Sequence, residues 1–143
     1  AAHAAFRAPH AAMLHTLYTK FPAYSGAVRL CKKWVASHLL DPHLHSEAVE
    51  LVAAHTFLQP GPCPPPASPV AGLLRFLRVL ADHPWSDFPL VVDPQNELSA
   101  AAKAQAYTFF DTARKANRGA AMWLVTPCDC ECEGWTRTHP SKV

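Results

Sequence analysis

Proline interrupts this chain so often that it decides which segments can form regular structure. Six prolines fall between Gln59 and Pro69, where neither a helix interior nor a central strand can persist, because proline lacks an N–H and has a fixed φ. We expect residues 59–69 to be an extended connector of polyproline II character, wrapped on the surface as a stiff loop. A proline-rich ligand for another domain is the alternative. Pro22 and Pro42 mark further breaks.

Four segments between these breaks carry apolar residues at helical spacing. The expected helices run from about Pro9 to Lys20, from a Ser25 N-cap to about Leu40, from a Ser46 N-cap to before Pro60, and from a Ser68 N-cap with Pro69 in the first position. The second helix should bury Val28, Cys31, Trp34, Val35 and Leu39, and the third should bury Val49, Val52, Ala53 and Phe57. Glu47 and Glu50 should lie near the positive N-terminal end of the third helix. The fourth helix, rich in leucine, is expected at the centre of the core.

The second half of the chain alternates a strand pattern with a helix pattern. Strands are expected at Pro89–Asp93 and Ala121–Thr126, with a helix from Asn96 or Ser99 to about Asn117 between them and Gly119 as its stop signal. That helix should turn Ala101, Ala104, Tyr107, Phe110 and Ala113 inward. The two strands could pair in parallel. The fold class is therefore mainly α (α+β), a bundle of about five helices with a small two-stranded β element.

The chain is expected to be a single domain over residues 1–143. Its core should span about residues 9–138, and residues 127–143 should form an irregular tail. The sequence begins with Ala1, without a signal peptide, so we interpret it as a fragment of a larger multidomain protein. No apolar run is long enough to span a membrane.

The sequence lacks the common motifs of catalytic sites. There is no glycine-rich phosphate loop, no Gly-x-Ser-x-Gly elbow and no His-Glu-x-x-His helix. The nearest match to a magnesium-binding acid pair is Asp129-Cys-Glu131, followed by Glu131-Cys-Glu133, in a tail without a strand pattern. We therefore predict no enzyme activity and no cofactor.

Metal binding is also not expected. Cys128, Cys130 and Cys132 lie at alternate positions, whereas zinc sites usually use Cys-x-x-Cys spacing. A small zinc module completed by Cys63 or a histidine is the alternative to free thiols in a mobile acidic tail. The nine histidines are interpreted as hydrogen-bonded or exposed side chains rather than ligands.

One helix face offers a candidate binding surface. Arg29, Lys32 and Lys33 should project opposite the apolar face, where they could contact RNA phosphates or an acidic protein surface. A solvated helix face is the alternative, and the net charge of +2 is too small to indicate nucleic acid by itself. Trp34 should point inward, and Trp85 and Trp135 should pack within the chain or anchor an interface.

Several strings stand out together and in a fixed order: Phe21–Val35, Ser46–Leu58 with the proline-rich stretch after it, Gly72–Leu77, His83–Asp93, Asn96–Leu98, Ala121–Pro127, Asp129 and Trp135–Thr136. In this order they resemble segments of the Nrap family, the nucleolar RNA-associated proteins. The chain resembles the fifth domain of this family over about residues 9–138. The three tail cysteines occupy positions that the family pattern leaves variable.

The resemblance implies a fold and a function. Nrap proteins are similar to tandem pairs of a nucleotidyltransferase domain and a poly(A)-polymerase/oligoadenylate-synthase-like helical domain, and this chain resembles the second helical domain. Val28–Trp34 is similar to the helix that faces the nucleotide in active polymerases. The resemblance implies a non-catalytic scaffold in the nucleus and nucleolus, within the small-subunit processome, that contacts pre-ribosomal RNA, processome proteins and neighbouring domains of the parent chain. The alternative is the helical, nucleotide-facing half of an active template-independent nucleotidyltransferase.

Overall fold

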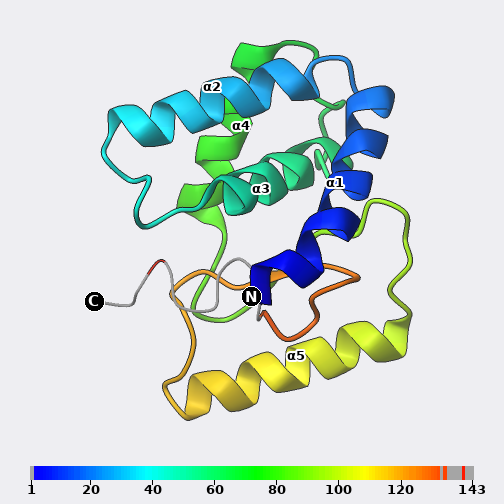
Figure 1. Ribbon diagram of the computed structural model, residues 1–143, viewed down its shortest axis with the longest axis vertical. Coiled ribbons are helices and arrows are strands. Elements are labelled where there is room, and N and C mark those ends of the chain that lie inside the picture. Colours follow the sequence, from blue (N-terminus) through cyan, green and yellow to red (C-terminus); the bar gives the residue numbers. More distant parts are fainter. Residues whose placement is uncertain (1, 133, 135–139, 141–143) are drawn as a thin grey trace.

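The computed structural model describes residues 2–132, 134 and 140. Its elements are α1 (Ala2–Lys20), α2 (Tyr24–Ser37), α3 (Ser46–Leu58), α4 (Pro69–Asp82), β1 (Leu90–Val91), α5 (Ala100–Lys115) and β2 (Leu124–Val125) (Figure 1). The strands pair in parallel, with Leu90 opposite Leu124 and Val91 opposite Val125. The described part is thus a helical bundle with a small two-stranded sheet, which confirms the predicted fold class. None of its helices is long and apolar enough to cross a membrane.

Helix α3 lies at the centre of the bundle. Every residue from Ala48 to Ala54 is buried, as are Thr56 and Phe57, and α2 and α4 pack against this helix. The prediction that α4 is central was wrong, because α4 fully buries only Gly72 and Phe76. A helix that is apolar all round is buried, whereas an amphipathic one such as α4 covers the core from outside. Val70 and Leu74, on the outer side of α4, are 59% and 61% exposed.

Of the three predicted serine caps, the one at Ser68 is correct, and Ser99, one of the two predicted starts of the fifth helix, is a cap as well. The Ser68 and Ser99 Oγ atoms each accept a hydrogen bond of 3.1 Å, from the backbone N–H of Ala71 and of Ala102. The caps predicted at Ser25 and Ser46 were wrong. Helix α2 already begins at Tyr24 after Ala23, and Ser46 is the first residue of α3 after His45, without a side-chain cap in either case.

Several helix ends differ from the prediction. Helix α1 starts at Ala2 instead of Pro9, so Pro9 lies in its interior. Its first turns diverge from the rest of the helix in Figure 1, as expected for a kink at an interior proline. Helix α2 ends at Ser37, so Leu39 does not join its apolar face: Leu39 has φ 57° and is 82% exposed. Asn117, with φ 54°, ends α5 before the expected stop at Gly119.

A second core lies between α5 and the segment after it. It is made of Leu98, Ala106, Phe110, Ala113, Trp123, Val125 and Cys132. The predicted inner face of α5 was right for Phe110 and Ala113. It was wrong for Ala101, Ala104 and Tyr107, which are exposed. Figure 1 shows α5 across one end of the molecule, apart from α2.

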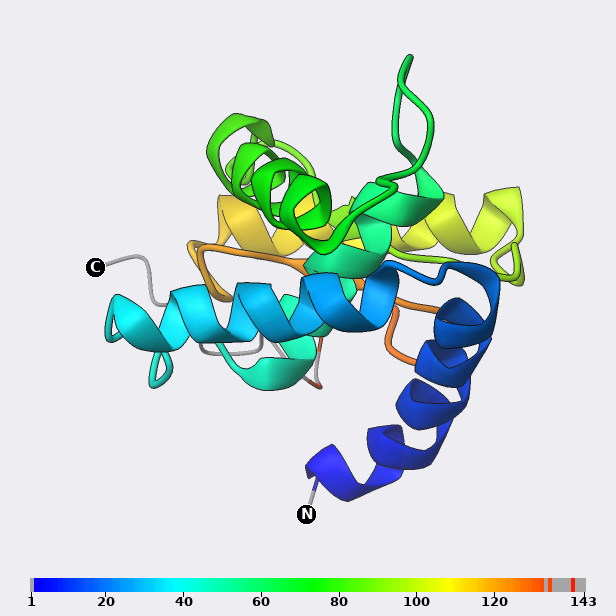
Figure 2. The same ribbon diagram turned by 90° about the horizontal axis from the view of Figure 1, so that it is seen from above.

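The proline-rich connector between α3 and α4 is not wrapped on the surface. Its residues from Gly61 to Pro65 are exposed, and the segment projects from the helical body in Figure 2. The connector is held to α4 by a hydrogen bond that the Arg75 guanidinium donates to the Pro64 carbonyl oxygen. Pro66 is buried where the chain rejoins the body.

Candidate interaction surface

Helix α2 carries the three predicted cations, but they have different surroundings. Arg29 and Lys33 are exposed and lie four residues apart, so they are neighbours on one side of the helix. Neither forms an ion pair with any residue that the structure describes. Lys32 is half-buried, and its ammonium group pairs with the Glu50 carboxylate. The solvent-facing part of the predicted patch is therefore Arg29 and Lys33.

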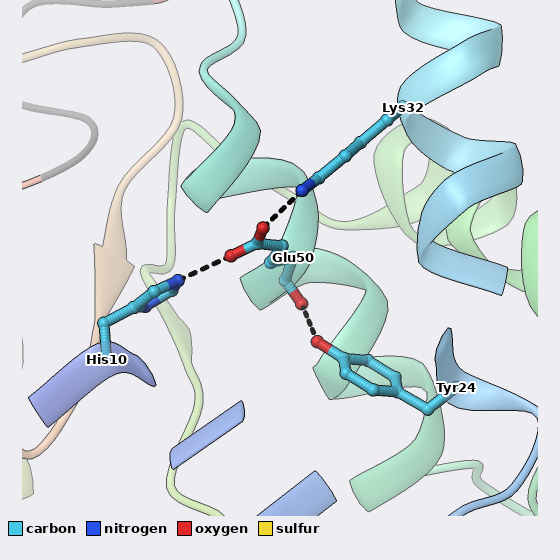
Figure 3. A network of polar contacts seen from close by, with 4 residues as sticks. All are labelled: His10, Tyr24, Lys32 and Glu50. Carbon is cyan, nitrogen blue, oxygen red and sulfur yellow. Dashed lines mark hydrogen bonds and ion pairs between the residues drawn. The ribbon is translucent and has the colours of Figure 1, made fainter. Parts of the chain in front are cut away.

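The Glu50 carboxylate lies at the junction of three helices (Figure 3). His10 Nε2 of α1 lies 2.7 Å from Glu50 Oε2, and Lys32 Nζ of α2 contacts Glu50 Oε1. The Tyr24 hydroxyl of α2 donates a 2.8 Å hydrogen bond to the Glu50 carbonyl. Glu50 is 9% exposed, so its charge is satisfied almost entirely by protein groups. We call His10, Tyr24, Lys32 and Glu50 the Glu50 centre.

Electrostatics at the Glu50 centre favour the ionised carboxylate. Burial alone would raise the pKa of Glu50, but hydrogen bonds and charge from His10 and Lys32 outweigh it and lower the pKa below its usual value. Burial raises the pKa of Tyr24 far above its ordinary value, so its hydroxyl keeps its proton and acts as a donor. The arrangement locks α1 and α2 onto α3.

This centre was not predicted from sequence. Glu50 was expected near the positive N-terminal end of α3 and Lys32 on the outer face of α2, but both side chains point toward the junction of the helices in Figure 3. One signal was present in the sequence: Glu50 is the only charged residue within the apolar run from Ala48 to Ala54. A carboxylate in such a run requires a partner when the helix is buried.

Trp34 is also less buried than predicted. It packs against the core from the side and is half-buried, with its ring stacked on His38 at a centroid distance of 4.2 Å. His38 in turn is tied to the helix, since its Nδ1 lies 2.8 Å from the Trp34 carbonyl oxygen. Trp85 packs within the chain, and its Nε1–H donates to the Leu80 carbonyl oxygen at 3.0 Å. Trp135 lies outside the described residues.

The described part of the tail is packed, in contrast to the mobile tail that was expected. Cys132 is 3% exposed within the second core, whereas Cys128 is exposed and Cys130 is half-buried. Asp129 is buried, and its Oδ2 accepts a 2.8 Å hydrogen bond from the Gly134 N–H. Glu131 is exposed, so this acid pair does not converge, and Glu133 lies outside the described residues. Within the described ranges, no group of three or more His, Cys, Asp or Glu side chains could hold a metal ion.

Two adjoining hollows lie where α3, α4, β1 and α5 approach one another, and no local pattern in the chain predicted them. One has a volume of about 500 Å³ and lies between the end of α3, the proline-rich connector and α4. The other has a volume of about 410 Å³ and lies between the end of α3, β1 and α5. Both are lined by His55, Gln59 and His83. We call the two hollows together the histidine groove.

Comparisons with known proteins agree on one family. Residues 21–143 match the family model described as Nrap protein PAP/OAS1-like domain 5. The chain is 40% identical to nucleolar protein 6 of Homo sapiens and 38% identical to that of Xenopus tropicalis, in each case over 128 residues that are 90% of this chain and 11% of the relative. It is also 36% identical over 84 residues to U3 small nucleolar RNA-associated protein 22 of Saccharomyces cerevisiae, which covers 59% of this chain and 7% of that protein. The chain thus spans about a ninth of the length of the nucleolar protein 6 relatives.

Proposed function

The chain belongs to the Nrap family, matching its domain 5, and on this basis we propose that it is a non-catalytic scaffold domain in ribosome biogenesis. It forms part of a longer multidomain protein of the nucleus and nucleolus that assists small-subunit assembly and pre-rRNA processing. Its partners are pre-ribosomal RNA, other processome proteins and the neighbouring domains of its own chain. The names of the relatives, nucleolar protein 6 and U3 small nucleolar RNA-associated protein 22, support this setting.

The Lys32–Glu50 pair is the observation that carries this proposal. The resemblance placed the Val28–Trp34 segment in the position of a nucleotide-facing helix of active polymerases. In this chain the central cation of that segment, Lys32, is held by a carboxylate of its own core. A cation paired in this way supports packing of α2 on α3 rather than the binding of a triphosphate.

The buried carboxylates support the same proposal. Within the described residues, the two buried acids are Glu50 and Asp129. Glu50 is bound by Lys32 and His10, and Asp129 accepts the Gly134 N–H. Both acids serve internal contacts and lie on different parts of the chain, so they do not form the acid pair that phosphoryl transfer with two metal ions needs.

Arg29 and Lys33 are the residues proposed to contact RNA or an acidic partner. Both are exposed on α2 and form no ion pair with the residues that the structure describes, so they can neutralise phosphates without breaking an internal contact. Lys32, the third residue of the predicted patch, is assigned a supporting role through Glu50. It holds the helix that presents the other two.

The test is recovery of partners from nucleolar extract with the tagged 143-residue chain at moderate salt. We expect the wild type to recover pre-ribosomal RNA and processome proteins, and the double variant R29E/K33E to recover less. The matched control is Lys115→Glu, which reverses an exposed charge on α5. Equal recovery by the wild type and R29E/K33E would show that Arg29 and Lys33 do not contact the partners. Template-independent nucleotide addition by the purified chain would exclude the non-catalytic scaffold assignment.

A further inference from the structure

The histidine groove has an excess of positive charge. Its lining includes Arg75, Arg78 and Lys103, against a single carboxylate, Asp82. The cations come from two helices that flank the groove, α4 and α5. Arg78 and Asp82 form an exposed ion pair of 3.5 Å, which is weak in water and leaves Arg78 able to exchange partners.

The floor of the groove presents polar atoms that have not all found partners. His55 Nδ1 is buried and makes no hydrogen bond within the described part of the chain. His83 shares the floor and points its Nε2 at the Phe88 carbonyl oxygen at 3.0 Å. Gln59, exposed at the end of α3, adds an amide with both a donor and acceptor. The exposed Gln59 amide is open to an oxygen-rich ligand, whereas His55 Nδ1 is buried and His83 Nε2 already faces the Phe88 carbonyl oxygen.

A flat aromatic surface borders the same groove. Tyr107 of α5 lines it beside Lys103, one helical turn away, and the Tyr107 side chain is 39% exposed. An exposed aromatic ring next to a cation is the arrangement on which single-stranded nucleic acids bind, with a base on the ring and the phosphate at the cation. An acidic peptide would use the cations but has no need of the ring.

We propose that the histidine groove binds a short single-stranded RNA segment, with its phosphates at Lys103 and Arg78 and a base stacked on Tyr107. This inference rests on the proposed function for its RNA partner and adds a second contact surface, separate from Arg29 and Lys33. The Asp82 carboxylate limits the affinity, because it competes with phosphate for Arg78. The proline-rich connector forms one wall through Pro60, Pro62 and Cys63.

The experiment uses fluorescence anisotropy of the 143-residue chain with a fluorescein-labelled oligouridylate of about 12 nucleotides, within the span that single-strand sites cover. Three variants test the three parts of the groove: Lys103→Gln, Tyr107→Leu and Asp82→Asn. Lys115→Gln, farther along α5, is the matched control. Thermal unfolding of each variant checks that the fold is kept.

Each part of the site has its own expected signature. Lys103→Gln should weaken binding and reduce the slope of log affinity against log salt by about 0.7, the value for one lost phosphate contact on a single strand. Tyr107→Leu should weaken binding by roughly fivefold or more with the slope unchanged, as for loss of one stacked base. Asp82→Asn should tighten binding, and Lys115→Gln should change nothing.

Three results would overturn the inference. The first is absence of binding by the wild-type chain, and the second is equal affinity of all folded variants. The third is displacement of the oligouridylate by polyglutamate together with unchanged affinity of Tyr107→Leu, which would assign the groove to acidic peptides. These results are distinguishable from failure of the proposed function. That function is judged by recovery of pre-ribosomal RNA and proteins from extract with R29E/K33E, a variant that leaves every groove residue intact.

Discussion

Gly72 of α4 lies so close to Ala27 of α2 that a Cβ added at Gly72 would stand 2.5 Å from the Ala27 Cβ. The same added atom would lie 3.3 Å from the Phe57 ring of α3. All three residues are buried. The absence of a side chain at Gly72 therefore allows α2, α3 and α4 to meet, and the bundle depends on this small contact.

Gly72→Ala should destabilise the chain although alanine favours helices. A methyl group forced into a packed contact costs about 1–3 kcal/mol of the free energy of unfolding, more than the roughly 1 kcal/mol gained in helix propensity. Urea unfolding followed by circular dichroism measures the change. The compensating double variant A27G/G72A should recover part of the loss, and a Gly72→Ala chain as stable as the wild type would show that the helices separate freely.

Glu50→Gln should make stability less dependent on acid. The pKa of Glu50 is lowered in the folded chain, so its ionised form stabilises the fold above the unfolded pKa of about 4.5, and this contribution is lost as pH falls through the folded pKa. We expect Glu50→Gln to unfold more easily near neutral pH, by about 1–3 kcal/mol, and the difference from wild type to shrink toward low pH. Glu47→Gln, in the same helix but outside the Glu50 centre, is the control.

Trp34→Ala should lower stability without abolishing folding. Trp34 was predicted to face fully inward, which would have made its removal as costly as that of a buried aromatic, about 3–5 kcal/mol. Because the ring is half-buried against His38, we expect a loss of about 1–2 kcal/mol. Phe76→Ala, at a position that is 0% exposed, should cost the full amount. Equal melting temperatures for the two variants would contradict this difference in burial.

Charge reversal on α2 should separate binding from stability. Lys32→Glu places a second carboxylate beside Glu50 and should destabilise the chain by about 3 kcal/mol or more, because the buried Glu50 keeps His10 but loses its lysine partner and gains a like charge. Lys33→Glu changes an exposed side chain and should shift the free energy of unfolding by less than about 0.5 kcal/mol. Chemical denaturation of both variants checks the contrast, and similar losses would refute the different environments of the two lysines.

The five cysteines should react with alkylating agents at different rates. Cys63 and Cys128 are exposed, whereas burial raises the pKa of Cys31 to about 12 and so suppresses its reactive thiolate. Treatment with iodoacetamide at about pH 8, followed by mass spectrometry, should show Cys63 and Cys128 modified first and Cys31 last. Rapid modification of Cys31 in the folded chain would contradict its burial.

Local signals made part of this fold predictable from sequence. Proline at the start of α4, together with the Ser68 and Ser99 caps, identifies two helix starts, because capping depends on neighbouring atoms only. The parallel pairing of β1 with β2 was suggested by two short apolar runs on either side of a helix, but its register, Leu90 opposite Leu124, was not predicted. The family resemblance, carried by strings in a fixed order, gave the overall architecture that these local patterns left open.

The features that were missed depend on contacts between distant residues. Lys32 and His10 reach Glu50 across 18 and 40 residues of sequence, and periodicity cannot report such pairs. The central position of α3 and the inner face of α5 could not be predicted for the same reason, because both depend on which neighbouring elements cover each helix. The histidine groove joins residues from α3, α4 and α5, whose order along the chain gives no hint of their proximity.

The division of the interior into two clusters affects how the molecule opens. The cluster around Phe110 and Trp123 is small. Apart from side-chain packing, two sets of hydrogen bonds join it to the main bundle. One is the two-residue pairing of β1 with β2, and the other is made by Arg114, which donates to the carbonyl oxygens of Trp85, Ala120 and Ala121. Native-state hydrogen exchange should therefore show α5 amides exchanging through a partial opening, well before those of α3. A partner that binds α5 would then slow that opening and leave the amide exchange of α3 unchanged.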